Sequence, residues 1–217
     1  MNAGGLRVER LGLVDYLPAL EAMRAFTAAR DAATPDEIWL LEHPPVYTLG
    51  QAGRPEHRLA DNGIPLVKTD RGGQITYHGP GQIVIYPLLD LARRGLGPRG
   101  LVRRLEQAVI ELLVEHGIVA RRLEGAPGVY VDRRDGAARL AGYPAKIAAL
   151  GLRVRRGRCY HGLSLNVDME LAPFSAINPC GHAGMTVTQT RDLGVDLTPA
   201  QAGEALIRHL LRQLESP

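Results

Sequence analysis

The chain has 217 residues, a formal net charge of +3 at pH 7 and hydrophobic residues at 45% of its positions. This length can bury a substantial core, which excludes a disulfide-stabilised miniature protein. The hydrophobic content excludes a disordered chain. Two cysteines, Cys159 and Cys180, are too few for a disulfide framework, and no signal-peptide pattern opens the chain. No segment approaches the roughly 20 apolar residues of a membrane span. We therefore expect a cytoplasmic protein with no membrane partner.

The first elements predicted along the chain are a strand and a helix. Residues 6–14 alternate in polarity as an edge strand does, and residues 16–30 carry apolar side chains at a helical period. A buried strand is predicted at 37–43, where two prolines end it. Two further strands are predicted at 64–70 and 82–89. They enclose a glycine-rich segment that we expect them to hold rigidly.

The second half begins with a helix at 100–116, followed by Gly117 at the usual position of a helix stop. A final amphipathic helix is predicted at 199–214, capped by Thr198. Four strand-like segments lie between them, at 118–123, 128–132, 145–154 and 159–167. Because strands outnumber helices without regular alternation, we expect an α+β fold, a mixed sheet flanked by helices. No linker or repeat divides the chain, so residues 1–217 are expected to form a single domain.

The glycine-rich segment Asp70–Gln82 holds the densest group of special residues. Its glycines permit positive φ and close approach of the backbone to a ligand, while Arg71 can bind an anion or a carbonyl and His78 can donate or accept a hydrogen bond. A tight hairpin is the alternative interpretation. Four glycines, a proline, an arginine and a histidine between two apolar strands favour a binding loop.

Two other patterns are weaker. The segment Gly95–Gly100 matches G-x-G-x-x-G, but no strand leads directly into it, so a flexible lead-in to the next helix is the better interpretation. Cys159 and Cys180 each precede a histidine by two positions, yet this spacing is unlike that of structural zinc sites. We expect no metal and no cofactor, and we interpret Cys159 as a buried thiol at the start of a strand.

Cys180 lies between Pro179 and Gly181, in a turn that could present its sulfur to a cleft. A nearby ammonium group would stabilise the thiolate, and Lys146 is the candidate, since it is one of only two lysines and stands in an otherwise apolar strand. A lysine on an edge strand, with its ammonium group reaching solvent, is the alternative.

At these residues the sequence resembles the bacterial lipoyl(octanoyl) transferases, of the superfamily that includes biotin ligases and lipoate-protein ligases. The resemblance rests on five blocks in order, EHPPVYTLG, RGGQITYHGPGQIVIYPLLDL, AKIAALGLRVRRG, HGLSLNV and NPCGHAGMTVTQ, which span nearly the whole chain. It implies the catalytic-domain fold of that superfamily. It also implies an acyltransferase that moves an octanoyl group from acyl carrier protein to a lysine of lipoyl domains, in 2-oxoacid dehydrogenases and the glycine cleavage H protein.

The resemblance also assigns roles to residues. Cys180 would carry the acyl thioester, and Lys146 would lower the pKa of its thiol. The implied acyl-binding residues are Arg71, Gly72, Gly73, Gln74, Ile75, Thr76, Tyr77, His78, Ala149, Leu150, Gly151, Gly162, Leu163 and Ser164. The enzyme is expected to act as a monomer.

Two runs of arginines could attract an acidic carrier protein electrostatically. They are Arg93, Arg94, Arg99, Arg103 and Arg104, and Arg153, Arg155, Arg156 and Arg158. No aromatic residues are interleaved with them, so nucleic acid binding is not expected.

Two rival functions remain open at this point. An ATP-dependent lipoate-protein ligase on the same fold would form an acyl-adenylate and would not need Cys180. A noncatalytic module would hold acyl carrier protein or a lipoyl domain without forming a covalent adduct.

Overall fold

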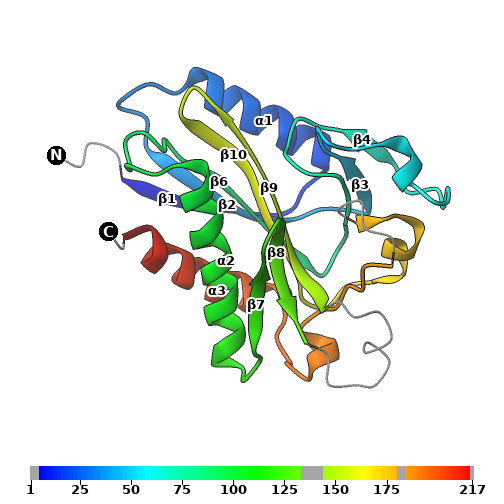
Figure 1. Cartoon of the computed structure of the whole chain (residues 1–217). Coiled ribbons are helices and arrows are strands. Elements are labelled where there is room, and N and C mark those ends of the chain that lie inside the picture. The colour runs from blue at the N-terminus through cyan, green and yellow to red at the C-terminus, as the bar shows by residue number, and fades with distance from the viewer. Residues whose placement is uncertain (1–4, 133–143, 180–183, 216–217) are drawn as a thin grey trace.

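The computed structural model describes residues 5–132, 144–179 and 184–215. Within them, three α-helices pack around two β-sheets (Figure 1). The strands are β1 (Leu6–Leu13), β2 (Asp36–Glu42), β3 (Val46–Leu49), β4 (Leu66–Lys68), β5 (Ile75–His78), β6 (Gln82–Leu88), β7 (Ala120–Leu123), β8 (Ala126–Val131), β9 (Ala145–Arg155) and β10 (Arg158–Asn166). The helices are α1 (Tyr16–Ala29), α2 (Pro98–Glu115) and α3 (Pro199–Glu215), with short 3-10 turns at Pro55–His57, Ala172–Ala176 and Arg191–Leu193.

The larger sheet is mixed, as expected. Its described strands run in the order β1-β2-β6-β10-β9-β8-β7, with β1 parallel to β2 and every other neighbouring pair antiparallel. The smaller sheet has the order β4-β3-β5, with β4 parallel and β5 antiparallel to β3. The predicted α+β class with a mixed sheet and flanking helices is therefore confirmed.

Both faces of the larger sheet are covered by helices. Along β2, Ile38 and Leu40 face the core formed with α2 and α3, whereas Trp39 and Leu41 face α1 on the other side. This division follows from the two-residue period of a strand. In Figure 1, α2 and α3 lie together on one side of the sheet and α1 on the other. Burial on both faces explains why the four middle residues of β2, 38–41, are all apolar.

Most predicted elements are present, and two strands were missed. The missed strands are β3, directly after the Pro44–Pro45 pair, and β5, inside the glycine-rich segment. Thr198 caps α3 as predicted: the Gln201 amide donates to its hydroxyl (3.2 Å), and its own amide donates to the Gln201 side chain (3.0 Å). Gly97 is the N-cap of α2, in agreement with the lead-in assigned to 95–100. None of the helices described has the length and apolar character needed to cross a membrane.

Candidate active site

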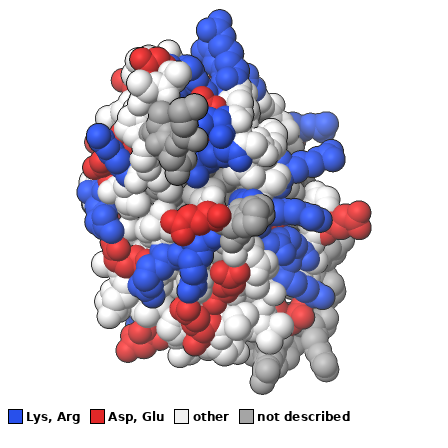
Figure 2. Space-filling view, turned by 90° about the vertical axis from the view of Figure 1, so that its left-hand side faces the viewer, with Lys and Arg blue, Asp and Glu red and all other residues white. Residues whose placement is uncertain are grey.

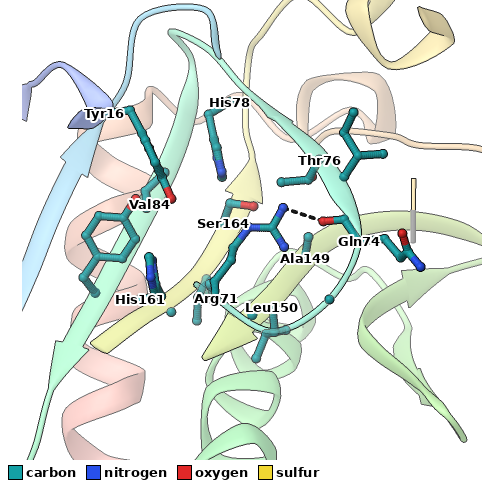
Figure 3. A pocket seen from close by; sticks show the side chains of 16 residues that line it. Tyr16, Arg71, Gln74, Thr76, His78, Val84, Ala149, Leu150, His161 and Ser164 are labelled. Carbon is teal, nitrogen blue, oxygen red and sulfur yellow. Dashed lines mark hydrogen bonds between the residues drawn. The ribbon is translucent and has the colours of Figure 1, made fainter. Parts of the chain in front are cut away.

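A cavity of about 50 Å³ lies between the glycine-rich segment and the β9–β10 hairpin (Figure 3). Five stretches from different parts of the chain line it: the start of α1, residues 71–78, β6, the middle of β9 and the middle of β10. The lining residues are Tyr16, Arg71, Gly73, Gln74, Ile75, Thr76, His78, Val84, Tyr86, Ala149, Leu150, Gly151, His161, Gly162, Leu163 and Ser164. The cavity therefore depends on the tertiary fold rather than on one motif.

Small residues form the wall that β9 and β10 contribute. In the ladder between these strands, Ser164 is opposite Ala149 and Gly162 is opposite Gly151. A Cβ added at Gly151 would lie 2.7 Å from the Gly72 carbonyl oxygen, and one at Gly162 would collide with the backbone of β6. Backbone and small side chains thus leave room for a slender apolar ligand.

Arg71 holds the glycine-rich loop in shape. Its guanidinium donates to the carbonyl oxygens of Gly72 (2.8 Å), Thr48 (2.6 Å) and Gln74 (2.6 Å) and to the Thr48 hydroxyl. The bond to Gln74 is the dashed line in Figure 3. All of these acceptors belong to the protein itself, and the binding of a ligand by Arg71 stays a prediction. Gly73, at φ +85, supplies the positive φ that the loop requires.

Neutral histidines close one side of the cavity. His78 donates from Nδ1 to the Gln82 side-chain oxygen (2.7 Å), and burial lowers its pKa to about 3. His43, just behind the wall, must donate from Nδ1 to the Val14 carbonyl (2.6 Å), so its Nε2 accepts the Tyr86 hydroxyl proton (2.7 Å). Burial lowers the pKa of His43 to about 4. This part of the wall is therefore uncharged at neutral pH.

His161 stands at the same side and is held by Asp70. The Asp70 carboxylate accepts hydrogen bonds from His161 Nε2 (3.0 Å) and the Tyr160 hydroxyl (2.6 Å), and Arg24 lies 3.1 Å away. These donors hold the pKa of Asp70 well below its usual range, with the His161 bond as the largest cause. Burial lowers the pKa of His161, so the neutral ring donates to a fixed carboxylate.

Lys146 lines a second, smaller cavity that adjoins the first. Its side chain is buried, with Nζ donating to the Pro127 carbonyl (3.0 Å) and lying 5.3 Å from the centre of the Tyr130 ring. Pro179, the residue before Cys180, also lines this second cavity. Thr76, Ala149 and Ser164 line both cavities, which are therefore adjacent and share a wall at these three residues.

The environment of Lys146 rules out the edge-strand interpretation. β9 lies between β10 and β8, and residues 186–188 bond to the Lys146 backbone through Thr186 O (2.9 Å) and Thr188 N (3.0 Å). Gly128, at φ +140, makes room for the side chain, because a Cβ there would lie 2.5 Å from Lys146 Cε. The lysine is thus enclosed on a central strand, close to a ligand-sized space.

The fold brings most of the expected binding residues together. Twelve of the fourteen line the first cavity, whereas Gly72 bonds to Leu152 O (2.9 Å) and Tyr77 packs in the core beside the small sheet. Cys180 lies outside the described residues. Cys159 is fully buried at the second position of β10, where burial raises the pKa of its thiol to about 12.

Sequence analysis missed four residues of the lining. They are Tyr16, Val84, Tyr86 and His161. The sequence offered one signal for this part of the lining: His161 directly precedes the Gly162–Ser164 segment, which was expected to bind the acyl group. The other three are single apolar or aromatic positions in a predicted helix and strand, where core packing is the ordinary expectation.

Comparison with known proteins agrees with this architecture. The family model described as "Lipoyl protein ligase A/B catalytic domain" matches residues 15–211. An octanoyltransferase of Dechloromonas aromatica is 63% identical over 208 residues, which cover 96% of each chain. An octanoyltransferase of Aromatoleum aromaticum is 63% identical over 209 residues, covering 96% of this chain and 86% of that one.

Solved structures share the fold. A putative lipoate protein ligase of Thermoplasma acidophilum, with bound lipoic acid, superposes with a TM-score of 0.72 at 20% identity, covering 97% of this chain and 86% of that one. At such identity the likeness concerns the fold alone. The family match over nearly the whole length and the high identity to octanoyltransferases show that this chain is an acyltransferase and belongs to the lipoyl protein ligase A/B catalytic domain family.

Proposed function

We propose that this enzyme transfers an octanoyl group from octanoyl-acyl carrier protein to a lysine of lipoyl domains, through a thioester on Cys180 activated by Lys146. One observation carries the proposal: buried Lys146 and Pro179, the neighbour of Cys180, line a cavity that adjoins the first, slender pocket. The relatives named octanoyltransferases support the octanoyl group as cargo. Residues 1–217 would act as one catalytic domain.

In the first half-reaction the Cys180 thiolate attacks the carbonyl carbon of the carrier's thioester. A new C–S bond forms as the old one breaks, and the departing carrier thiolate takes up a proton from the Lys146 ammonium, which becomes a neutral amine. The Lys146 ammonium would stabilise the attacking thiolate. Exchange of one thioester for another is nearly isoenergetic, so the step needs no ATP.

In the second half-reaction the acceptor lysine attacks the Cys180 thioester as a free amine. Lys146, neutral once the thiolate has been acylated, would accept the proton that the amine loses, and the Cys180 thiolate departs. Backbone amides would stabilise the oxyanion in both halves. The Gly72 amide is excluded from that role, because it already donates to the Leu152 carbonyl (2.9 Å).

The two arginine runs differ in how much positive charge they present to an acidic carrier protein. Arg93 and Arg94 of the first run bind the buried Asp36 carboxylate, which reduces the charge that they offer to a partner. Arg155 and Arg156 of the second run are exposed, and with Arg24, Arg158 and other residues they line a surface recess. That recess lies nine residues along β9 from Lys146, or about 30 Å, so it would steer the carrier body rather than hold the reacting thioester.

The surface charges agree with long-range steering rather than one docking patch. On the face in Figure 2, basic side chains gather at the top and along the right-hand edge, and elsewhere on this face basic and acidic side chains are interspersed. Steering of this kind weakens with ionic strength, because the Debye length is about 8 Å at 0.15 M salt. A steep fall in the rate of acylation between low and physiological salt is therefore expected.

Intact-mass analysis after mixing with octanoyl-acyl carrier protein tests the covalent step. Wild-type protein should gain one octanoyl group, and Cys180→Ser should gain none. Absence of an adduct together with tight carrier binding would support the noncatalytic module. Turnover of free octanoate and ATP that survives in Cys180→Ser would support a ligase.

The role of Lys146 is tested by the pH dependence of Cys180 alkylation. In Lys146→Ala the midpoint should move to higher pH, because the thiolate loses its cation. Lys146→Arg should keep a low midpoint yet transfer poorly, since a guanidinium supplies charge but no usable base. Identical midpoints in wild type and Lys146→Ala would contradict the pairing.

A further inference from the structure

His161 adopts a backbone conformation that histidine rarely takes. Its φ is +57, in the left-handed region, although the residue is almost completely buried within β10. A non-glycine residue there costs on the order of 1 kcal/mol, and such residues cluster at functional sites. The strain must therefore be compensated by the surrounding structure.

The partner strand explains how the conformation arises. Leu163 is opposite Ile85, and the Cys159 amide donates to the Leu89 carbonyl, so His161 falls opposite Pro87 of β6. Proline has no amide hydrogen to donate, and the β10–β6 ladder is interrupted at this point. The interruption lets β10 turn locally and places the imidazole in the cavity wall.

The contacts around His161 fix its ring in that wall. Asp70 accepts its Nε2 hydrogen (3.0 Å), the Tyr160 ring stacks on it with centroids 5.0 Å apart, and the Tyr86 ring meets it edge-on at 6.3 Å. Figure 3 shows His161, Tyr16 and Val84 on one side of the cavity and Thr76 and Gln74 on the other. Thr76 is one of the residues shared with the Lys146 cavity. His161 thus lies at the end of the pocket away from Lys146.

The length from the shared wall of the two cavities to His161 matches the cargo. Three residues of β10 separate Ser164, at the junction of the cavities, from His161, which is about 10 Å at the rise of a strand. An extended octanoyl chain, with seven C–C bonds that each advance about 1.3 Å, is about 9 Å long. A chain two carbons longer would need about 2.5 Å more and would meet the imidazole.

We propose that His161 is the specificity-determining residue that limits the acyl chain to about eight carbons, as the end wall of the pocket, held in place by Asp70 and Tyr160. The inference rests on the proposed function for the identity of the cargo. It adds a chain-length limit, at a residue that makes no contact with the reacting atoms.

The test compares acyl chains of eight, ten and twelve carbons in wild type and His161→Gly. Glycine suits φ +57, so the substitution removes the ring and relieves the strain. The ratio of decanoyl to octanoyl transfer should rise about ten-fold, the effect of burying two more methylenes. Arg156→Gly is the matched control, because Arg156 also has positive φ (+51) but is exposed on the β9–β10 turn. Its ratio of decanoyl to octanoyl transfer should equal that of wild type, even where the loss of a carrier-steering arginine lowers both rates.

Binding of sodium octanoate, decanoate and dodecanoate, measured by titration calorimetry, separates this inference from the proposed function. A shift toward longer chains in His161→Gly supports the inference even if no variant transfers acyl groups. The double variant Asp70→Asn/His161→Gly removes the carboxylate that the lost ring would expose, and it should show the same shift. An unchanged order of affinities in both folded variants would overturn the inference.

Discussion

Replacing Gly128 by alanine should displace the Lys146 side chain, because the added methyl group would collide with it. In Gly128→Ala the new Cβ would lie 2.5 Å from Lys146 Cε, 2.7 Å from the Ala148 carbonyl oxygen and 3.0 Å from Lys146 Nζ. The first and third contacts can be relieved only if the end of the lysine side chain moves. The second is with backbone, and φ +140 is a region open essentially to glycine alone, so we expect a stability loss of about 3 kcal/mol.

The displacement has a calculable effect on the proposed thiolate. For a sulfur–ammonium separation that grows from about 4 Å to about 7 Å at an effective dielectric constant near 20, the attraction weakens by about 2 kcal/mol. That corresponds to a rise of about 1.5 units in the pKa of the Cys180 thiol. Alkylation of Cys180 by iodoacetamide, followed by intact mass across pH 5 to 10, measures the shift.

Gly125→Ala provides the control for this experiment. Gly125 also has a positive φ (+73) and lies just before β8, but a Cβ there would meet no atom within 4 Å. It should lose about 1 kcal/mol of stability and keep both transfer and the alkylation profile of wild type. If Gly128→Ala is folded and has that same wild-type profile, the position of Lys146 does not control the thiol and the reasoning fails.

Three further predictions concern stability and labelling. Asp36→Asn should reduce the free energy of unfolding in urea by about 3 kcal/mol, because its buried carboxylate binds three arginines, whereas Asp132→Asn, at an exposed ion pair, should change it by less than about 0.5 kcal/mol. His43 and His78 stay neutral when folded, with pKa values of about 4 and about 3, but bind protons near pH 6.5 when unfolded. Stability in urea should therefore fall as pH drops from about 6.5 to 4, by about 3 kcal/mol for His43 alone, and a flat profile there would contradict their burial as neutral groups. Cys159 should resist iodoacetamide under native conditions, because burial raises its thiol pKa to about 12, and Cys159→Ala should transfer octanoyl groups at the wild-type rate.

Periodicity alone was sufficient to predict the helices and the long strands. The heptad-like spacing of Leu101, Leu105 and Leu112 reappears as the buried face of α2, and the apolar run of β2 reappears as a strand covered on both sides. These elements bury enough apolar surface for one face to dominate the pattern. Short strands give no such signal, which is why β3 and β5, with four residues each, were missed.

The site was predicted only where motifs are continuous in sequence. The glycine-rich segment and the small residues of β9 and β10 were identified in advance, and they do line one cavity. The pairing of His161 with Asp70, 91 positions apart, could not be foreseen, because it depends on how α1 and the small sheet pack against β10. Likewise, β9 lies inside the sheet because it pairs with β8, and a single sequence does not show which strands pair.

The arrangement of charge along the pocket gives a reason for its neutral histidines. A protonated imidazole beside an acyl chain would have to be desolvated against methylenes, which is costly in an interior of low dielectric constant. Burial avoids this cost, because it lowers the pKa values of His43 and His78 far below neutrality. The negative charge of Asp70, behind His161, is compensated by Arg24 and by the hydrogen bonds donated to its carboxylate. The one cation that the proposed chemistry requires, Lys146, stands at the opposite end of the pocket. Acid should therefore weaken acyl binding as the pH falls toward the pKa values of His43 and His78, because the wall of the pocket then gains positive charge.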